Sequence, residues 1–280
     1  MDSSVRRTCR LRWSISAASE AGDPKACNED WMMASENQIV VLDGATARTG
    51  TGCMHGISWL VAKLGSTLAG LAADLDASLP STLMTSIQAL ADQHRATCDL
   101  LHPGTPSAAV ALLRLNETVL EYLVLGDVTV IIDTADGLKV VADDRVDRTA
   151  RVEREEADRY PFGSAEKKAA LLRMKHAELA ARNTPGGYWV AAADPTAARY
   201  AITGKIPLDT IRRVAVLTDG AARLVALFKL LDWPDVLDLL DQHGPTELIR
   251  RVRAFEAADP SCMRWARNKR SDDATAAYAV

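Results

Sequence analysis

Two patterns of apolar residues run through the chain. Short blocks rich in branched apolar side chains and bounded by Asp, Gly or Pro are typical of strands, whereas apolar residues spaced by three and four are typical of amphipathic helices. Strands are predicted at residues 9–19, 30–34, 37–42, 107–115, 119–125, 128–133, 138–141, 188–192, 199–206, 212–217 and 274–280. Helices are predicted at residues 52–75, 80–101, 221–229, 234–243 and 246–257.

Residues 145–183 differ from the rest because they are densely charged and helical in pattern, with an interruption at 160–163. The strong turn signal Thr184-Pro185-Gly186-Gly187 follows them. Since the chain shows neither an internal repeat nor a linker, a single domain over residues 1–280 is expected. Runs of strands separated by paired helices, without regular alternation, favour an α+β fold with helices packed on antiparallel sheets.

Charge and hydropathy narrow the classes of function. The net charge is −4 and the sequence pI is about 5.8. A nucleic-acid-binding protein requires a basic surface, so no nucleic-acid partner is expected. No apolar run approaches the roughly 18 residues of a membrane span, so no membrane association is expected. The basic start is not followed by an apolar segment, which argues against a secretory signal and makes the cytoplasm the expected location. No oligomeric state is predicted.

Cysteine and histidine form no metal-site pattern in the sequence. Five cysteines are an odd number for a disulfide framework, and no Cys-x-x-Cys pair indicates a zinc site. The five histidines also lack a mutual spacing typical of metal ligands. We therefore expect free thiols and histidines with surface or structural roles. The residues concerned are Cys9, Cys27, Cys53, Cys98, Cys262, His55, His94, His102, His176 and His243.

Acidic residues stand at the ends of predicted strands, several of them beside a glycine. The set consists of Glu29-Asp30, Asp43-Gly44, Gly126-Asp127, Asp219-Gly220 and Asp272-Asp273. A neighbouring glycine lets the backbone approach closely, and carboxylate oxygens are the ligands that Mg²⁺ and Mn²⁺ prefer. A single Asp-Gly pair is more often a turn, so the signal lies in the complete set.

At these positions the sequence resembles the metal-dependent type 2C (PPM) protein serine/threonine phosphatases, especially their bacterial members. The resemblance spans nearly the whole chain, and the motifs occur in the family's order. The matching segments are KACNED (25–30), VLDG (41–44), GTPSAA (104–109), LGDV (125–128), LTDG (217–220) and DDAT (272–275).

The resemblance implies a four-layer αββα sandwich, in which two antiparallel sheets are flanked by helices, and a centre of two Mn²⁺ or Mg²⁺ ions. Asp43 would bridge the two ions, and the carbonyl of Gly44 would bind one of them. Asp219 and Asp273 would complete the other metal site. Lys25 falls on the family's phosphate-binding position.

Further roles follow from the same resemblance. Glu29 and Asp30 would act through metal-bound waters or orient the ligands, and Asp127 would belong to a third, weaker metal position. Residues 145–183 fall where the family carries its variable flap, so we expect them to border the cleft. A solvated helical insert without a substrate role is the other interpretation of this segment.

The implied activity is hydrolysis of phosphoserine and phosphothreonine in a phosphorylated protein substrate, by a water that two metals activate. This agrees with the lack of an obvious Cys or Ser nucleophile motif. Three positions depart from the family: Lys25 replaces an arginine, Ala45-Thr46 replaces His or Met followed by Gly, and Ala274 replaces Asn. The alternative is a non-catalytic scaffold or sensor of the same fold.

The segment around Asp43 has a further interpretation, as the opening aspartate loop of a haloacid-dehalogenase-type phosphatase. That family requires a second acidic residue two positions after its nucleophilic aspartate, and Ala45 stands there. The chain also lacks the βαβ alternation of that fold. We therefore exclude it.

Overall fold

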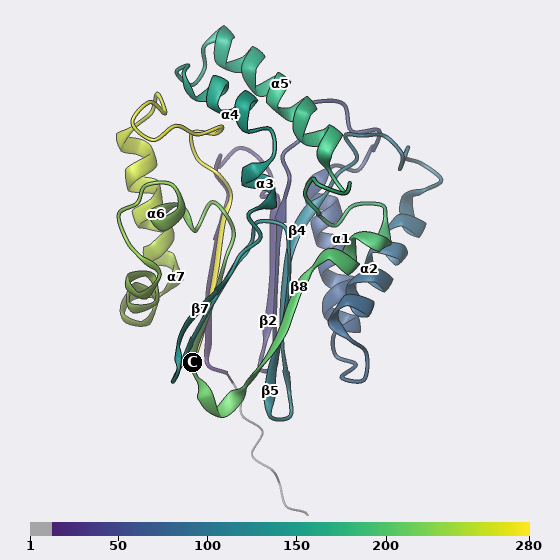
Figure 1. The fold of residues 1–280 in the computed structure, drawn as a ribbon, viewed down its shortest axis with the longest axis vertical. Coiled ribbons are helices and arrows are strands. Elements are labelled where there is room, and N and C mark those ends of the chain that lie inside the picture. Colours follow the sequence, from purple (N-terminus) through teal and green to yellow (C-terminus); the bar gives the residue numbers. More distant parts are fainter. Residues whose placement is uncertain (1–12) are drawn as a thin grey trace, which may run out of the picture.

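Two five-stranded antiparallel sheets pack face to face in the computed structural model, which describes residues 13–280 (Figure 1). The first sheet contains, in order, β1 (Ile15–Glu20), β10 (Ala274–Ala279), β9 (Ile211–Leu217), β6 (Thr129–Thr134) and β7 (Gly137–Val141). The second contains β2 (Asp30–Ser35), β3 (Gln38–Gly44), β4 (Ala108–Asn116), β5 (Val119–Leu125) and β8 (Ile202–Pro207). Helices cover the outer face of each sheet, so the predicted four-layer αββα sandwich is confirmed.

The helices fall into three groups (Figure 1). The second sheet is covered by α1 (Ile57–Leu71) and α2 (Leu79–His94), and the first by α6 (Arg223–Ala226) and α7 (Trp233–Ala258). The remaining three lie across one end of the sandwich: α3 (Arg145–Arg148), α4 (Arg151–Asp158) and α5 (Ala165–Ala181). Helices therefore do occur within the charged stretch 145–183. The break in α7 at Gly244, before Pro245, separates the two helices predicted there.

The strand β3 shows why the sequence pattern predicts the layers. Ile39 and Val41 pack between the two sheets, whereas Val40 and Leu42 pack against α1 and α2. Successive side chains of a strand point to opposite faces, so a strand covered on both faces has a continuous apolar run. Burial of each such side chain contributes about 1.5–3 kcal/mol. The run ends at Asp43, where the strand reaches the end of the sandwich.

The consecutive strands predicted over 107–141 suggest a β-meander, and this interpretation is wrong in one respect, because β5 and β6 belong to different sheets. The chain crosses between the sheets at Gly126-Asp127. Gly126 has φ +83°, and a Cβ there would lie 2.7 Å from the Cβ of Ala109. The crossing therefore requires glycine, and it directs the next residue into the space between the sheet ends.

The strand predicted at 188–192 is also wrong. Ala191 forms an isolated bridge with Ala108, which also pairs with Gly44 of β3, and β5 pairs with β4 from Val110 onward. Because β3 and β5 occupy both edges of β4 beyond this point, the segment cannot extend its pairing.

Element boundaries differ at several other places. The helix predicted at 52–75 begins only at Ile57, after Gly56 with φ +78°, and the helix predicted at 80–101 ends at His94. The helix predicted at 221–229 shortens to α6, and the strand predicted at 199–206 begins only at Ile202, after a 3₁₀ turn. The first part of the strand predicted at 9–19 lies outside the described residues.

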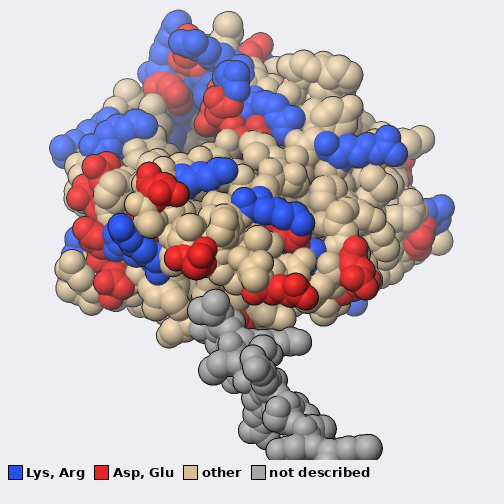
Figure 2. All heavy atoms as spheres, turned by 60° about the horizontal axis from the view of Figure 1, so that its bottom comes forward, with Lys and Arg blue, Asp and Glu red and all other residues tan. Residues whose placement is uncertain are grey.

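None of the helices in residues 13–280 has the length and apolar character needed to cross a membrane. Figure 2 shows one face of the molecule, on which basic and acidic side chains are interspersed. The expectation that the chain binds no nucleic acid stays a prediction.

Candidate metal centre

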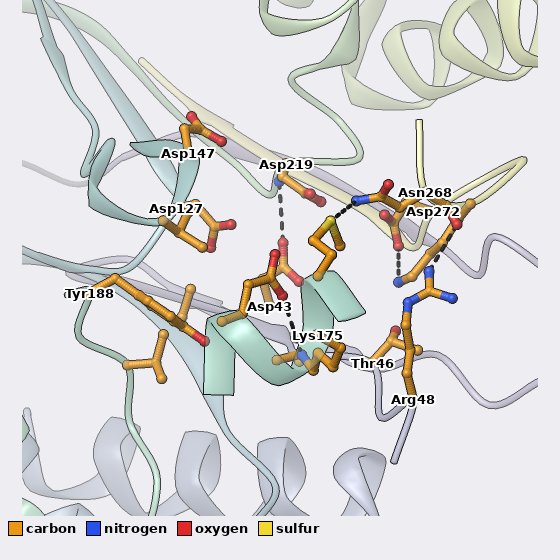
Figure 3. A pocket seen from close by; sticks show the side chains of 18 of the residues that line it. Asp43, Thr46, Arg48, Asp127, Asp147, Lys175, Tyr188, Asp219, Asn268 and Asp272 are labelled. Atoms are coloured by element: carbon orange, nitrogen blue, oxygen red, sulfur yellow. Dashed lines mark hydrogen bonds and ion pairs between the residues drawn. The ribbon is translucent and has the colours of Figure 1, made fainter. Parts of the chain in front are cut away.

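A cleft lies at the end of the sandwich, beneath α3, α4 and α5, where strands of both sheets end. Four of the aspartates that line it come from strand ends: Asp43 lies near the end of β3, Asp127 between β5 and β6, Asp219 just after β9, and Asp272 just before β10. A fifth, Asp147, comes from α3. Figure 3 shows Asp43 with the other three strand-end aspartates around it. We call this the acidic cleft. Segments far apart in the sequence thus bring four carboxylates to one place.

Two glycines make this convergence possible. A Cβ on Gly44 would lie 2.4 Å from the carbonyl oxygen of Glu29, to which the Gly44 amide donates a hydrogen bond of 3.1 Å. A Cβ on Gly220 would lie 2.0 Å from the carbonyl oxygen of Asp273. Both glycines therefore stand where two backbones touch, and a side chain would push apart the segments that carry the carboxylates.

Asp43 and Asp219 are in direct contact across the two sheets. The backbone amide of Asp219 donates a hydrogen bond of 3.2 Å to Oδ2 of Asp43. Desolvation within the cleft, followed by the charge of Asp219, raises the pKa of Asp43 well above its ordinary value. Asp219 is accessible at the cleft mouth, yet desolvation of its carboxylate and the charge of Asp272 raise its pKa as well. The site thus favours a positive charge between these groups.

The pKa values of Asp127 and Asp30 are raised as well. Desolvation, followed by the charge of Asp219, raises the pKa of Asp127 to about 7. Asp30 lies beneath the cleft, where its Oδ2 accepts hydrogen bonds from the hydroxyls of Thr218 (3.0 Å) and Thr275 (2.7 Å). Burial outweighs these bonds and raises its pKa to about 7.

Basic side chains also line the cleft, but several are already paired. Asp272 forms ion pairs with Lys269 and with Arg223, the latter at 2.9 Å. Arg48 donates one hydrogen bond of 2.8 Å to the backbone oxygen of Asn268. Lys175 lies 3.9 Å from a carboxylate oxygen of Glu178, and burial lowers the pKa of Lys175. Arg48 and Lys175 are therefore the cleft cations with the weakest anionic pairing (Figure 3).

The structure does not bring every predicted residue into the cleft. Both oxygens of Asp273 accept backbone amides, from Gly22 at 2.7 Å and Glu29 at 2.6 Å. The carboxylate of Glu29 accepts a hydrogen bond from the hydroxyl of Thr46, which does line the cleft. Lys25 is exposed and is not among the residues that line the cleft. These three lie around the site rather than in it.

Sequence reasoning missed several cleft residues. Asp272 was recognised only as the neighbour of Asp273, although it is the carboxylate that faces the cleft. The insert contributes Asp147, Arg154 and Lys175, which are hidden within a charged helical pattern. Arg48 lies a few residues after the Asp43-Gly44 pair, and this short distance along the chain could have indicated that it lies near the site.

The donor set fits hard divalent cations. The four carboxylates offer only oxygen ligands. Bound positive charge would offset the desolvation and the mutual repulsion that raise the pKa values of Asp43, Asp127 and Asp219. Of the four, only Asp272 forms ion pairs with basic side chains among the described residues. Asp43, Asp127, Asp219 and Asp272 are thus the residues that could hold Mn²⁺ or Mg²⁺, with Gly44 beside them.

Comparison with known sequences and structures gives contrasting results. Neither a protein-family sequence model nor a curated protein sequence matches the chain. Among solved structures, the catalytic domain of the serine/threonine protein phosphatase PstP, in complex with two manganese ions, has a TM-score of 0.55 at 16% identity, over 96% of this chain and 97% of that one. The serine/threonine phosphatase of S. agalactiae has a TM-score of 0.56 at 14% identity, covering 95% of this chain and 98% of its own.

A third similar structure is the PPM serine/threonine phosphatase MsPP from Mycobacterium smegmatis, in complex with cacodylate. Its TM-score is 0.54 at 16% identity, over 95% of this chain and 97% of that one. At such identities the likeness concerns the fold, and it extends over nearly the whole length of each protein. The chain therefore has the fold of the PPM serine/threonine phosphatases, as the sequence motifs indicated.

Proposed function

We propose that the protein is a metal-dependent phosphomonoester hydrolase that dephosphorylates phosphoserine and phosphothreonine in protein substrates. The observation that carries this proposal is the convergence of four aspartates in one cleft of a phosphatase fold, where desolvation raises the pKa of Asp43, Asp127 and Asp219. A binding module would gain nothing from carboxylates that repel one another. In the absence of a counter-charge they destabilise the fold.

Two divalent cations held by Asp43, Asp127, Asp219 and Asp272 would supply activation of the attacking water and stabilisation of the phosphoryl oxygens. The chain's own residues have three tasks. The aspartates bind and orient the cations. The Asp219 amide fixes the Asp43 carboxylate. Thr218 and Thr275 hold Asp30 beneath the cleft.

For the phosphate we propose Arg48 and Lys175 instead of Lys25. Both line the cleft, and neither has a strong carboxylate partner. A guanidinium binds phosphate through two parallel hydrogen bonds, and an ammonium binds it as a point charge. The exposed position of Lys25 favours a peripheral contact with the substrate protein.

We further propose that the chain acts as one phosphatase-like unit whose helices α3, α4 and α5 form a flap over the cleft. Asp147, Arg154 and Lys175 of this segment line the cleft, which supports a role in substrate choice. Arg182, just after α5, donates hydrogen bonds to the carbonyls of Thr105 (2.6 Å) and Pro103 (2.7 Å). These bonds anchor one end of the flap to the body of the protein.

The test is hydrolysis of p-nitrophenyl phosphate and of a phosphothreonine peptide with Mn²⁺ or Mg²⁺. We expect activity that EDTA abolishes, and a fall of at least about 100-fold in Asp43→Asn and in Asp219→Asn. Asparagine keeps the shape of the side chain and removes its charge, so folding is preserved. A protein that binds Mn²⁺ but hydrolyses neither substrate would support the scaffold instead. Unchanged activity in both variants would refute the site.

A further inference from the structure

Two cysteines and two histidines meet outside the acidic cleft, beside the start of α1. Cys53 and His55 belong to the loop before α1, His94 is the last residue of α2, and Cys98 follows in the next turn. One sulfur or ring nitrogen from each of the four lies within 4.8 Å of the others. We call these four side chains the Cys/His cluster. No motif in the sequence indicates this cluster, because the two pairs are far apart in the chain.

The spacing of the atoms is that of a tetrahedral zinc site. Nδ1 of His55 lies 3.7 Å from the sulfur of Cys53 and 3.3 Å from that of Cys98, and Nδ1 of His94 lies 3.7 Å from the sulfur of Cys53. Ordinary zinc bond lengths place sulfur and nitrogen ligands about 3.6 Å apart, and two sulfur ligands about 3.8 Å apart. The two sulfurs are 3.2 Å apart, so a small side-chain rotation completes the geometry.

The surroundings hold the cluster in place and partly shield it from solvent. The amide of His55 donates to the sulfur of Cys53 at 3.4 Å. Trp59 stacks on His55 with ring centroids 4.2 Å apart, which shields one side of the cluster. His94 is only 1% exposed.

Backbone contacts bring the two ligand pairs together independently of any metal. The amide of Asp99 donates a hydrogen bond of 2.8 Å to the carbonyl of Gly52. Gly52 has φ +66°, and a Cβ on it would lie 2.5 Å from the Cβ of His102. The loop before α1 and the turn after α2 are therefore in close contact, and the four ligands are preorganised.

We propose that the Cys/His cluster binds one structural zinc ion, which fastens the loop between β3 and α1 to the end of α2. Two thiolates and two imidazoles select zinc over Mg²⁺ or Mn²⁺, which prefer oxygen ligands. Four protein ligands leave no open coordination position, so the ion has a structural role. The same loop carries Thr46 and Arg48 into the acidic cleft, and the ion limits its movement. This proposal does not depend on the proposed phosphatase activity.

The test is the zinc content of protein purified without chelators, measured by mass spectrometry of the metal. We expect about one zinc ion per chain in the wild type, in Asp219→Asn, which alters the acidic cleft, and in Cys27→Ser, an exposed matched control. Cys53→Ser and Cys98→Ser should each lose about nine-tenths of the zinc and lower the Tm by about 5 °C or more. Zinc retained in both serine variants but lost in Asp219→Asn would overturn the assignment.

A second measurement does not require the variants to fold. Metal-free wild-type protein is titrated with Co²⁺, and the visible and near-ultraviolet absorption is recorded. Thiolate-to-cobalt charge-transfer bands together with intense tetrahedral bands at one equivalent would support the site, because no cysteine thiol lines the acidic cleft. Absence of these bands, or isolation of Cys53 and Cys98 as a disulfide under anaerobic conditions, would reject it.

Discussion

The acidic cleft and the Cys/His cluster are two groups of ionisable side chains built in opposite ways. The cleft collects oxygen donors from strand ends of both sheets, whereas the cluster collects sulfur and nitrogen donors from a loop and a helix end on one side of the second sheet. Aspartates in an accessible cleft suit cations that keep some bound water and exchange their ligands. Thiolates and imidazoles that surround a single point suit a permanently bound structural ion.

The comparison also shows how position affects what each group can do. The carboxylates line the cleft beneath α3, α4 and α5, while Trp59 stacks on His55 of the cluster. The cleft is therefore suited to chemistry and the cluster to holding structure. The loop after β3 joins the two, since Arg48 lies at one end and Cys53 at the other.

The largest predicted effect on activity should distinguish the adjacent carboxylates of Asp272 and Asp273. Asp272→Asn removes a carboxylate that faces the acidic cleft, so kcat/KM for p-nitrophenyl phosphate with Mn²⁺ should fall at least about 100-fold. Asp273→Asn weakens hydrogen bonds from the amides of Gly22 and Glu29, so it should cost about 1–2 kcal/mol of stability and less than about tenfold in kcat/KM.

Both variants should keep the zinc of the Cys/His cluster, which serves as the internal control for folding. The measurements are steady-state kinetics and denaturant unfolding. A larger loss of activity in Asp273→Asn than in Asp272→Asn would identify Asp273 as the metal ligand, as the sequence resemblance implied.

This pair of residues shows where sequence reasoning reached its limit. Asp43, Asp127 and Asp219 could be predicted because each lies within two residues of the end of an apolar strand, and these strand ends meet at one end of the sandwich. Asp272 and Asp273 precede a strand that begins only at Ala274, so their directions depend on the turn that leads into it. Adjacent residues point in different directions, and the motif alone did not decide between them.

The Cys/His cluster could not be predicted for a different reason. A zinc motif is recognised in sequence when its ligand pairs have a characteristic spacing, and neither Cys53-x-His55 nor His94-x₃-Cys98 does. The pairs meet because α2 returns along α1, which places the end of one helix beside the start of the other. Helices packed on antiparallel sheets, by contrast, were predicted correctly from the apolar patterns within each segment, and the four-layer order that the family resemblance implied is confirmed.

A smaller effect should distinguish the cations inside the cleft from the one outside it. Arg48→Ala should lower kcat/KM by about tenfold, mainly through KM, because a phosphate-binding guanidinium is lost from the cleft. Lys25→Ala should change kcat/KM for p-nitrophenyl phosphate by less than about twofold, because Lys25 lies outside the cleft lining. Equal losses in both variants would show that the loop of Lys25 closes over the substrate.

The smallest effect concerns pH, and it should have opposite signs in the two regions. A carboxyl whose pKa is higher in the folded than in the unfolded chain binds its proton more tightly when folded, so it favours folding at low pH. The pKa of Asp30 rises from 3.8 to about 7 because the residue is buried. Its contribution is complete below about pH 4 and is lost as the pH rises through 7. Metal-free protein should therefore lose stability from pH 5 to pH 8.

In the Cys/His cluster, acid should instead release the ion, because zinc binding requires deprotonated thiols. Denaturant unfolding in EDTA at pH 5 and pH 8, together with dye-detected zinc release over the same range, measures both signs. Asp30→Asn should flatten the pH dependence of stability and leave the pH dependence of zinc release unchanged. The reason is that Asp30 contacts Thr218 and Thr275 rather than the cluster. An unchanged stability profile in Asp30→Asn would assign the pH dependence to the cleft aspartates themselves. In either case, the two regions would remain separable by the direction in which pH acts on them.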